Sequence, residues 1–382
     1  MHLKPHTANR IFHVTYSRPW SLMGFLKSIL SVLAIITGLS SAQEYGSHTL
    51  PADLADSTAK VLGALNKDPN NANRTLGYSE GPATDMDGNL FFTEGQDNTG
   101  NIFKVTLDGK ESVFFSGPTQ PNGMEFDPQG RLTVCEKGSV STFDKAGVRT
   151  QLSNPGNVDL KNVNDLSIAS DGSMWLTNHG TGNTYFYRDP SGVITTYPNT
   201  NALGVLVPNG IEYLEEKKLL FVNSSDDNKV YLFDVSAAHK PSNKRVFASV
   251  PVPDGLTVDE KGNVYIASFN DGAIYVFDPT GNQLLGKIKV TGDANPVANT
   301  SNCVFGGIDG KTLYMTGDAG AFKLQMKVAG RKRPGSVGLH AGRSQLFHRG
   351  PNTWKTRTTL LGRSISQRLP VATLAVFESP SR

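Results

Sequence analysis

The chain has 382 residues, of which 19% are charged, and it contains 39 glycines and 21 prolines. This composition favours many short strands joined by tight turns, and long helical patterns are almost absent. Residues 43–330 carry 23 basic and 33 acidic side chains, a net charge of −10. Because a segment this acidic would repel phosphate backbones, nucleic acid is not expected as a partner.

The amino-terminal residues 1–42 have the pattern of a secretory signal peptide. Lys27 precedes an apolar run at 29–39, and the small residues 40–42 offer a cleavage site. The run is too short for a membrane span, so no span is expected after the signal is removed. Because a polar stretch precedes this pattern, we expect Met23 to be the true start. The prediction is a secreted or periplasmic protein; the alternative is a buried hydrophobic element.

A short unit recurs six times between residues 80 and 313, and each copy opens on a Glu, Asn or Asp. The first residues of the copies are separated by 42, 42, 45, 45 and 48 positions. These six residues, named here the repeat heads, are Glu80, Asn122, Asn164, Asn209, Asp254 and Asn302. A period of about 40 to 50 residues is typical of propellers and solenoids.

The fifth copy shows what one unit contains. Strand-like runs at 256–258, 264–267, 273–277 and 283–290 are separated by turns rich in Asp, Asn and Gly. The third copy repeats this pattern, with runs at 174–177, 185–188 and 193–197. Four antiparallel strands in about 40 residues form a propeller blade. The sequence therefore predicts an all-β, six-bladed β-propeller of four-stranded blades with a central metal-binding channel.

The ends of the predicted propeller, residues 43–330, need to be joined. Residues 59–65 precede the first copy and residues 322–328 follow the last, so we expect them to share one blade. The remaining segment, 331–382, has ten basic residues against one acidic residue and no repeat. It is predicted to be a basic, disordered tail or non-native translated sequence.

The two cysteines, Cys135 and Cys303, lie in strand-like runs of non-adjacent repeats. A disulfide is permitted outside the cell, but this separation favours two separate buried thiols. Their spacing does not suggest zinc binding by cysteine.

The repeat heads are the candidate metal site. Radial symmetry brings equivalent positions of all blades to one axis, so six oxygen-bearing side chains would face a single point. Two carboxylates with amide oxygens suit Ca²⁺, Mg²⁺ or Mn²⁺, with Zn²⁺ also possible. The alternative is that these residues only form turns, as Asn, Asp and Gly do elsewhere in each repeat. The change of residue type among the heads favours the metal site.

Five motifs around the heads, in order, resemble the senescence-marker-protein-30/gluconolactonase/luciferin-regenerating-enzyme family, over about residues 60–330. The motifs are Ser79-Glu80-Gly81-Pro82, Val163-Asn164-Asp165, Pro208-Asn209-Gly210, Pro253-Asp254-Gly255 and the run from Cys303 to Gly307. The resemblance implies a six-bladed propeller that holds one divalent cation in its channel. It further implies a small-molecule lactone as substrate.

Residue roles follow from the resemblance by motif. Glu80, Asn209 and Asp254 are implied metal ligands, and Asp254 is also the implied general base. Asn164 is the fourth residue of the predicted metal site: it would lie beside the metal and touch substrate or water. Two departures put the preferred sugar in doubt: Asn162 stands where the animal branch has an arginine, and the strand after Asn164 ends in Thr177-Asn178-His179-Gly180 instead of Asp-Pro.

The function predicted from these residues is metal-dependent hydrolysis of a small lactone, such as the aldonolactone gluconolactone, by a metal-polarised carbonyl and an Asp254-activated water. Asn122, Asn164, His179 and Asn302 are predicted to contact substrate, although His179 could equally be a solvated loop residue. Ca²⁺ is the preferred cation. A nucleophilic serine enzyme is disfavoured because no Gly-x-Ser-x-Gly element is present.

Two alternatives remain. One is a metal-free, strictosidine-synthase-like propeller, and the other is a secreted propeller that binds calcium or a ligand without catalysis. The Glu80, Asn209 and Asp254 combination argues against the metal-free relative. Turnover of a lactone would separate an enzyme from a binding protein.

Overall fold

A computed structural model of the chain describes residues 43–94, 100–117, 119–180, 183–291, 299–318 and 320–335. The predicted signal peptide, Met23 and most of the predicted tail lie outside these residues. The chain divides into two units, residues 1–340 and 341–382, and all of the described residues belong to the first. That unit is all-β, and its described part contains one helix, the single-turn η1 (Phe269–Asp271). None of the described helices could cross a membrane.

Four four-stranded antiparallel sheets follow one another along the chain. The first sheet contains β5 (Ser79–Thr84), β6 (Leu90–Glu94), β7 (Asn101–Val105) and β8 (Glu111–Ser116). The second contains β9 (Pro121–Phe126), β10 (Leu132–Glu136), β11 (Ser139–Phe143) and β12 (Arg149–Gln151). The third contains β13 (Val163–Ile168), β14 (Met174–Asn178), β15 (Thr184–Arg188) and β16 (Ile194–Pro198). The fourth contains β17 (Pro208–Leu214), β18 (Leu219–Ser224), β19 (Lys229–Val235) and β20 (Pro241–Ser249).

The other large sheet has nine strands. In spatial order these are β21 (Pro253–Val258), β22 (Val264–Ser268), β23 (Ala273–Phe277), β24 (Leu284–Val290), β1 (Glu44–His48), β2 (Val61–Leu65), β27 (Gly320–Gln325), β26 (Thr312–Gly317) and β25 (Thr300–Gly306). Strands β3 (Lys67–Asp68) and β4 (Asn71–Thr75) form a separate hairpin. The strands predicted for the third and fifth copies are thus confirmed, within three residues at their ends.

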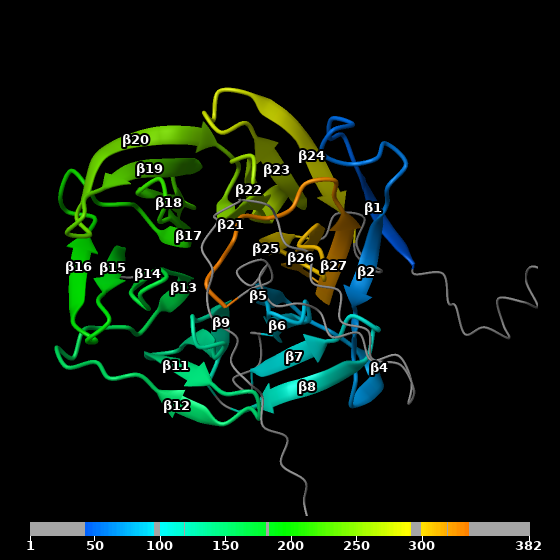
Figure 1. Cartoon of the computed structure of the whole chain (residues 1–382), viewed down its shortest axis with the longest axis horizontal. Helices are drawn as coiled ribbons and strands as arrows, with labels where there is room; N and C mark the ends of the chain where they lie inside the picture. Colours follow the sequence, from blue (N-terminus) through cyan, green and yellow to red (C-terminus); the bar gives the residue numbers. More distant parts are fainter. Residues whose placement is uncertain are drawn as a thin grey trace, which may run out of the picture. The chain divides into compact units, whose positions relative to one another are not determined.

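The first strands of the six repeats lie around a common centre. In the contact pattern β5 touches β9, β9 touches β13, and so on through β17 and β21 to β25, which touches β5 again. Figure 1 shows these strands innermost, with the later strands of each sheet farther out. The ring of contacts is therefore closed, as a propeller requires.

The turns that join first and second strands explain why the repeats fold as hairpins. At Asp259–Gly262, the Asp259 carboxylate accepts hydrogen bonds from the backbone N–H groups of Lys261 and Asn263, both at 2.9 Å. Gly262 has a φ of 90°, which a residue with a side chain adopts only with strain. The Asp and Gly of the repeat are therefore turn residues.

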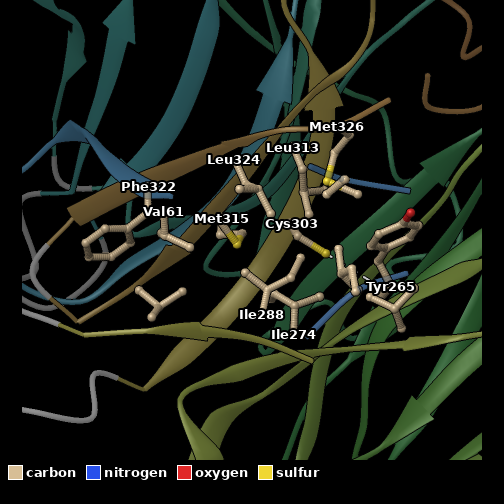
Figure 2. Packing of buried hydrophobic residues seen from close by; sticks show 14 of the residues in the cluster. Val61, Tyr265, Ile274, Ile288, Cys303, Leu313, Met315, Phe322, Leu324 and Met326 are labelled. Atoms are coloured by element: carbon tan, nitrogen blue, oxygen red, sulfur yellow. Dashed lines mark hydrogen bonds between the residues drawn. The ribbon is translucent and has the colours of Figure 1, made fainter. Parts of the chain in front are cut away.

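The hydrophobic core lies between neighbouring sheets. Figure 2 shows the part of the core that the nine-stranded sheet encloses, where Val61 of β2 and Phe322 of β27 pack with Ile274, Ile288 and Met315. Cys303 lies in this cluster and Cys135 in another, and both are free and buried. The prediction of two separate thiols is confirmed.

The two ends of the repeat region are held together by strand pairing. β2 pairs with β27 in antiparallel register, with Leu62 opposite Lys323 and Leu65 opposite Ala321. This confirms the predicted union of residues 59–65 with residues 322–328. The sequence analysis missed β1, which pairs with β24 on one side and β2 on the other.

The chain continues from β27 as a segment that we name the C-terminal strap, residues 326–335. Its backbone bonds to distant parts of the fold: Lys327 N–H donates to Leu54 O at 2.8 Å, and Arg331 N–H donates to Val258 O at 2.9 Å. The side chains of Arg331 and Arg333 are buried. Residues 331–335 were placed in the predicted disordered tail, and the structure instead packs them against the sheets. The prediction of a disordered tail is therefore wrong for residues 331–335 and stays a prediction for residues 336–382.

Candidate functional site

Strand register places the repeat heads at one end of the ring. Glu80, Asn122, Asn164, Asn209 and Asp254 are each the second residue of their first strand, and Asn302 is the third residue of β25. Because the six strands are equivalent members of one ring, equal positions along them lie at the same level. The heads therefore converge near the start of the innermost strands.

Six of the seven predicted site residues line one cavity of about 420 Å³, named here the site cavity: Glu80, Asn122, Asn164, His179, Asn209 and Asp254. A second cavity of about 430 Å³, the side cavity, shares Glu80, Asn122, Asn164 and His179 with it. Because four of the predicted residues line both cavities, the two form one continuous recess. This volume is of the size that binds small molecules.

Two buried carboxylates in the site cavity share one hydroxyl group. Tyr78 Oη donates to Glu80 Oε1 at 2.7 Å and lies 3.3 Å from Asp254 Oδ2. Glu80 and Asp254 are 5% and 4% exposed, so both acids are held largely out of water. The contacts to one oxygen bring the two carboxylates within a few ångströms of each other.

Burial and mutual repulsion change the acidity of this pair. Burial raises the pKa of Glu80 to about 7, against the opposing hydrogen bonds from Tyr78 and the Gly81 N–H group. Burial, followed by the negative charges of Glu80 and Asp165, raises the pKa of Asp254 well above its usual range. Burial and the two carboxylates also raise the pKa of Tyr78, which keeps its hydroxyl a donor.

Asn302 lines neither cavity, so its predicted contact with substrate stays a prediction. Its Oδ1 accepts a hydrogen bond from the Cys303 N–H group at 2.8 Å, and its Nδ2 lies 3.4 Å from Asp165 Oδ2. It also bonds to Glu80. Its side chain thus holds the two acids Glu80 and Asp165 through hydrogen bonds.

His179 lies where the site cavity meets the side cavity. Its backbone N–H group donates to Asn162 O at 2.9 Å, which holds the loop after β14 against the start of β13. The ring bonds to the Pro208 carbonyl, and burial lowers the pKa of the imidazole. Among the described residues, the buried Nδ1 has no hydrogen-bond partner. Burial thus favours the neutral ring, whose Nδ1 is an acceptor that no described residue uses.

Two residues of the site were missed by the sequence analysis. Tyr78 precedes Glu80 by two positions and lies in a bend just before β5, outside the strand whose register places the heads. Asp165 follows Asn164 directly, and burial raises its pKa to about 7. The signal for Asp165 was its place in the Asn164-Asp165 motif.

The donor set fits a divalent cation. Within the described ranges, no three His, Cys, Asp or Glu side chains are grouped as metal ligands, so a cation would need amide oxygens as well. Asn209 supplies one, since its amide lies beside Asp254 and hydrogen-bonds to it. Neither Glu80 nor Asp254 forms an ion pair with a described side chain. Two adjacent buried carboxylates raise the free energy of the folded state when no positive charge is near them. A bound cation would supply that charge and stabilise the ionised pair.

Comparisons with known proteins agree with this geometry. Residues 78–318 match the model of the SMP-30/Gluconolactonase/LRE-like region. A gluconolactonase from Zymomonas mobilis is 26% identical over 293 residues, which cover 66% of this chain and 80% of that protein.

Solved structures share the fold. A gluconolactonase from Xanthomonas campestris superposes with a TM-score of 0.63 at 22% identity, covering 75% of this chain and 99% of the other. A calcium-binding protein, regucalcin, from Agrobacterium tumefaciens superposes with a TM-score of 0.57 at 19% identity, covering 68% and 93%. Since the family model spans well over half of its residues, the chain belongs to the SMP-30/gluconolactonase/LRE-like family.

Proposed function

We propose that this protein is a metal-dependent lactonase that opens a small sugar lactone, such as an aldonolactone. The observation that carries the proposal is the contact of Tyr78 Oη with both Glu80 and Asp254 inside the site cavity. Family membership and the gluconolactonase relative support lactone hydrolysis. The proposal includes a six-bladed architecture, in which the nine-stranded sheet counts as two blades joined through β1.

Glu80, Asn209 and Asp254 would hold the cation, with Asn164 beside it. Oxygen donors suit Ca²⁺ best, and the calcium-binding structural relative supports that choice. Mg²⁺, Mn²⁺ and Zn²⁺ are the other candidates. When bound, the cation would polarise the lactone carbonyl and stabilise negative charge on its oxygen.

The side chains of the cavity would handle the water and the substrate. With the cation beside it, Asp254 would be ionised and would accept a proton from the attacking water as the water oxygen bonds to the carbonyl carbon. The ring C–O bond then breaks, the ring oxygen takes a proton, and the product is a hydroxy acid. Asn122, Asn164 and His179 would orient substrate hydroxyls through hydrogen bonds. A positioned general base typically contributes about 10² to 10⁴ in rate.

The test uses the full chain with and without chelator on gluconolactone, aryl esters and phosphotriesters. We expect chelation to abolish lactone hydrolysis and added Ca²⁺ to restore it. Asp254→Asn should lower kcat at least about 100-fold. Asp278→Asn is the control, since Asp278 lies in the turn between β23 and β24 and lines neither cavity, and it should stay within a few-fold of the parent. Unchanged turnover in Asp254→Asn, or in excess chelator, would contradict the proposal.

Export is a separate proposal, which rests on the sequence pattern at 23–42. Cells that secrete the protein should release a chain whose amino terminus lies near residue 43, and sequencing of the mature terminus checks this. Retention of residues 1–42 in the purified protein would exclude a cleaved signal.

A further inference from the structure

We propose that the substrate is a lactone with an anionic substituent, a carboxylate or a phosphate ester, and that Lys137 and Lys161 bind this group. The inference rests on the proposed lactonase function and adds to it a substrate class. It starts from the difference in charge between the two cavities that meet at Glu80, Asn122, Asn164 and His179.

The side cavity is basic at the end away from the shared residues. Lys137 lies in the turn between β10 and β11, and Lys161 lies in the loop that leads into β13. The other polar side chains at this end are the neutral amides of Gln120 and Asn162. Apart from the shared Glu80, the lining of this cavity contains no carboxylate.

Both ammonium groups are available to a ligand. Lys137 and Lys161 are exposed, and neither forms an ion pair with any side chain in the described part of the chain. Glu136, the acid next to Lys137, is buried and bound to Arg149 at 2.7 Å. Asp159, the acid closest in sequence to Lys161, accepts a hydrogen bond from the Lys161 backbone N–H group at 3.0 Å. Neither Glu136 nor Asp159 therefore forms an ion pair with Lys137 or Lys161.

The site cavity has the opposite character. Beyond the residues that it shares with the side cavity, its lining has two acids, Asp226 and Asp254, and no Lys or Arg. The rest of this lining is Val207, Asn209, Ser225, Val252 and Phe269. An anionic group at this end would meet Asp226 and apolar surface, while at the other end it meets two cations. This asymmetry sets the orientation of a bound lactone, with its ring at the Glu80–Asp254 pair and its anionic substituent toward Lys137 and Lys161.

The matched substrates are glucarolactone and gluconolactone. Glucarolactone has a terminal carboxylate where gluconolactone has a hydroxymethyl group. We expect the full chain to have the higher kcat/KM for glucarolactone, and this preference to shrink as salt rises. Lys137→Met and Lys161→Met should each lower the preference about threefold to fivefold, and the double variant about tenfold or more. Lys110→Met, an exposed lysine on the first sheet away from both cavities, is the control and should change nothing. A phosphorylated aldonolactone in the same assay separates phosphate from carboxylate.

A binding experiment keeps the test independent of turnover. Calorimetric titration with glucarate and with gluconate should show tighter glucarate binding that the double variant loses. If glucarate binds in this way while no lactone is opened, the lactonase proposal fails and the anion site stands. Equal affinity for the two acids, or an equal effect of the double variant on both lactones, would overturn the anion site.

Discussion

Arg333, near the end of the described chain, forms a buried ion pair with Glu212 on β17. The Arg333 side chain is 12% exposed and that of Glu212 is 1% exposed. The same guanidinium group lies 3.2 Å from Glu125 on β9 and donates to Thr257 on β21 at 3.1 Å. One residue of the C-terminal strap thus joins three of the innermost strands.

The Arg333 contacts predict a stability role for the strap. Arg333→Met should lower the free energy of unfolding by about 3 to 5 kcal/mol, because it leaves the buried Glu125 without its counter-charge. Glu125→Gln in addition should recover part of this loss. Urea denaturation measures both effects. The control is Arg245→Met, whose pair with Asp234 is exposed and should contribute at most about 1 kcal/mol. A loss no larger than that of the control would contradict a role for the buried pair.

Tyr78 provides a test of the shared hydroxyl. Tyr78→Phe keeps the ring, which packs edge-on against Phe269 at 5.7 Å between centroids, and removes only the hydroxyl that contacts Glu80 and Asp254. Groups that orient metal ligands typically contribute about 10-fold to 100-fold in metal affinity. We therefore expect weaker Ca²⁺ binding by about that factor in calorimetry.

The control for Tyr78 is Tyr231→Phe. Tyr231 also donates to an aspartate, Asp227, at 2.6 Å, but neither residue lines the site cavity. Its removal should leave Ca²⁺ affinity unchanged. Equal affinities in the parent and Tyr78→Phe would show that the hydroxyl does not orient the ligands.

Asn302 and Asn122 should behave differently although both are repeat heads. Asn302→Ala removes the acceptor of the Cys303 N–H group and a donor to the buried Asp165, so it should cost about 1 to 3 kcal/mol of stability with little change in KM. Asn122→Ala, in the cavity wall, should raise KM for the lactone roughly threefold to tenfold with little effect on stability. Denaturation and steady-state kinetics of both variants separate the roles. A raised KM with unchanged stability in Asn302→Ala would show that Asn302 contacts substrate.

The ring and its heads were open to sequence analysis because their cause is local. Each repeat carries its own turn signal, such as Asp259 and Gly262, and period-two alternation then sets which residues face the centre. The equal position of Glu80 and Asp254 along their strands follows from that register. Local patterns repeated six times therefore fixed the strands and the position of the candidate site.

The strap was missed because its partners are remote in sequence. Arg331 and Arg333 stand 119 and 121 residues after Glu212. Their neighbours in the sequence do not indicate that they pair with a buried acid. In sequence they read as the start of a basic tail. Buried Glu212 and Glu125, on strands expected to line a channel, were the other half of the signal. The pairing of these arginines with Glu212 and Glu125 is seen only in the folded structure.

His179 predicts a pH dependence of stability that its neighbours do not share. Burial lowers the pKa of its imidazole below 6.5 in the folded protein, so the unfolded chain takes up the proton at higher pH than the folded one. As pH falls through 6.5 toward the lowered pKa, proton uptake therefore favours unfolding. Below the lowered pKa both states are protonated, and the loss stays constant.

The change that isolates this effect is His179→Gln, measured by urea denaturation in chelator from pH 7.5 to pH 5. The raised pKa values of Glu80 and Asp165 act in the opposite direction, since a folded state that binds protons more readily gains stability as pH falls. These acids are present in both proteins, so their contribution cancels in the difference. We expect the stability of the parent to decrease relative to the variant below pH 6.5. His179→Leu should give the same trend, because only the titrating ring matters; a constant difference would show that His179 is not held neutral by burial.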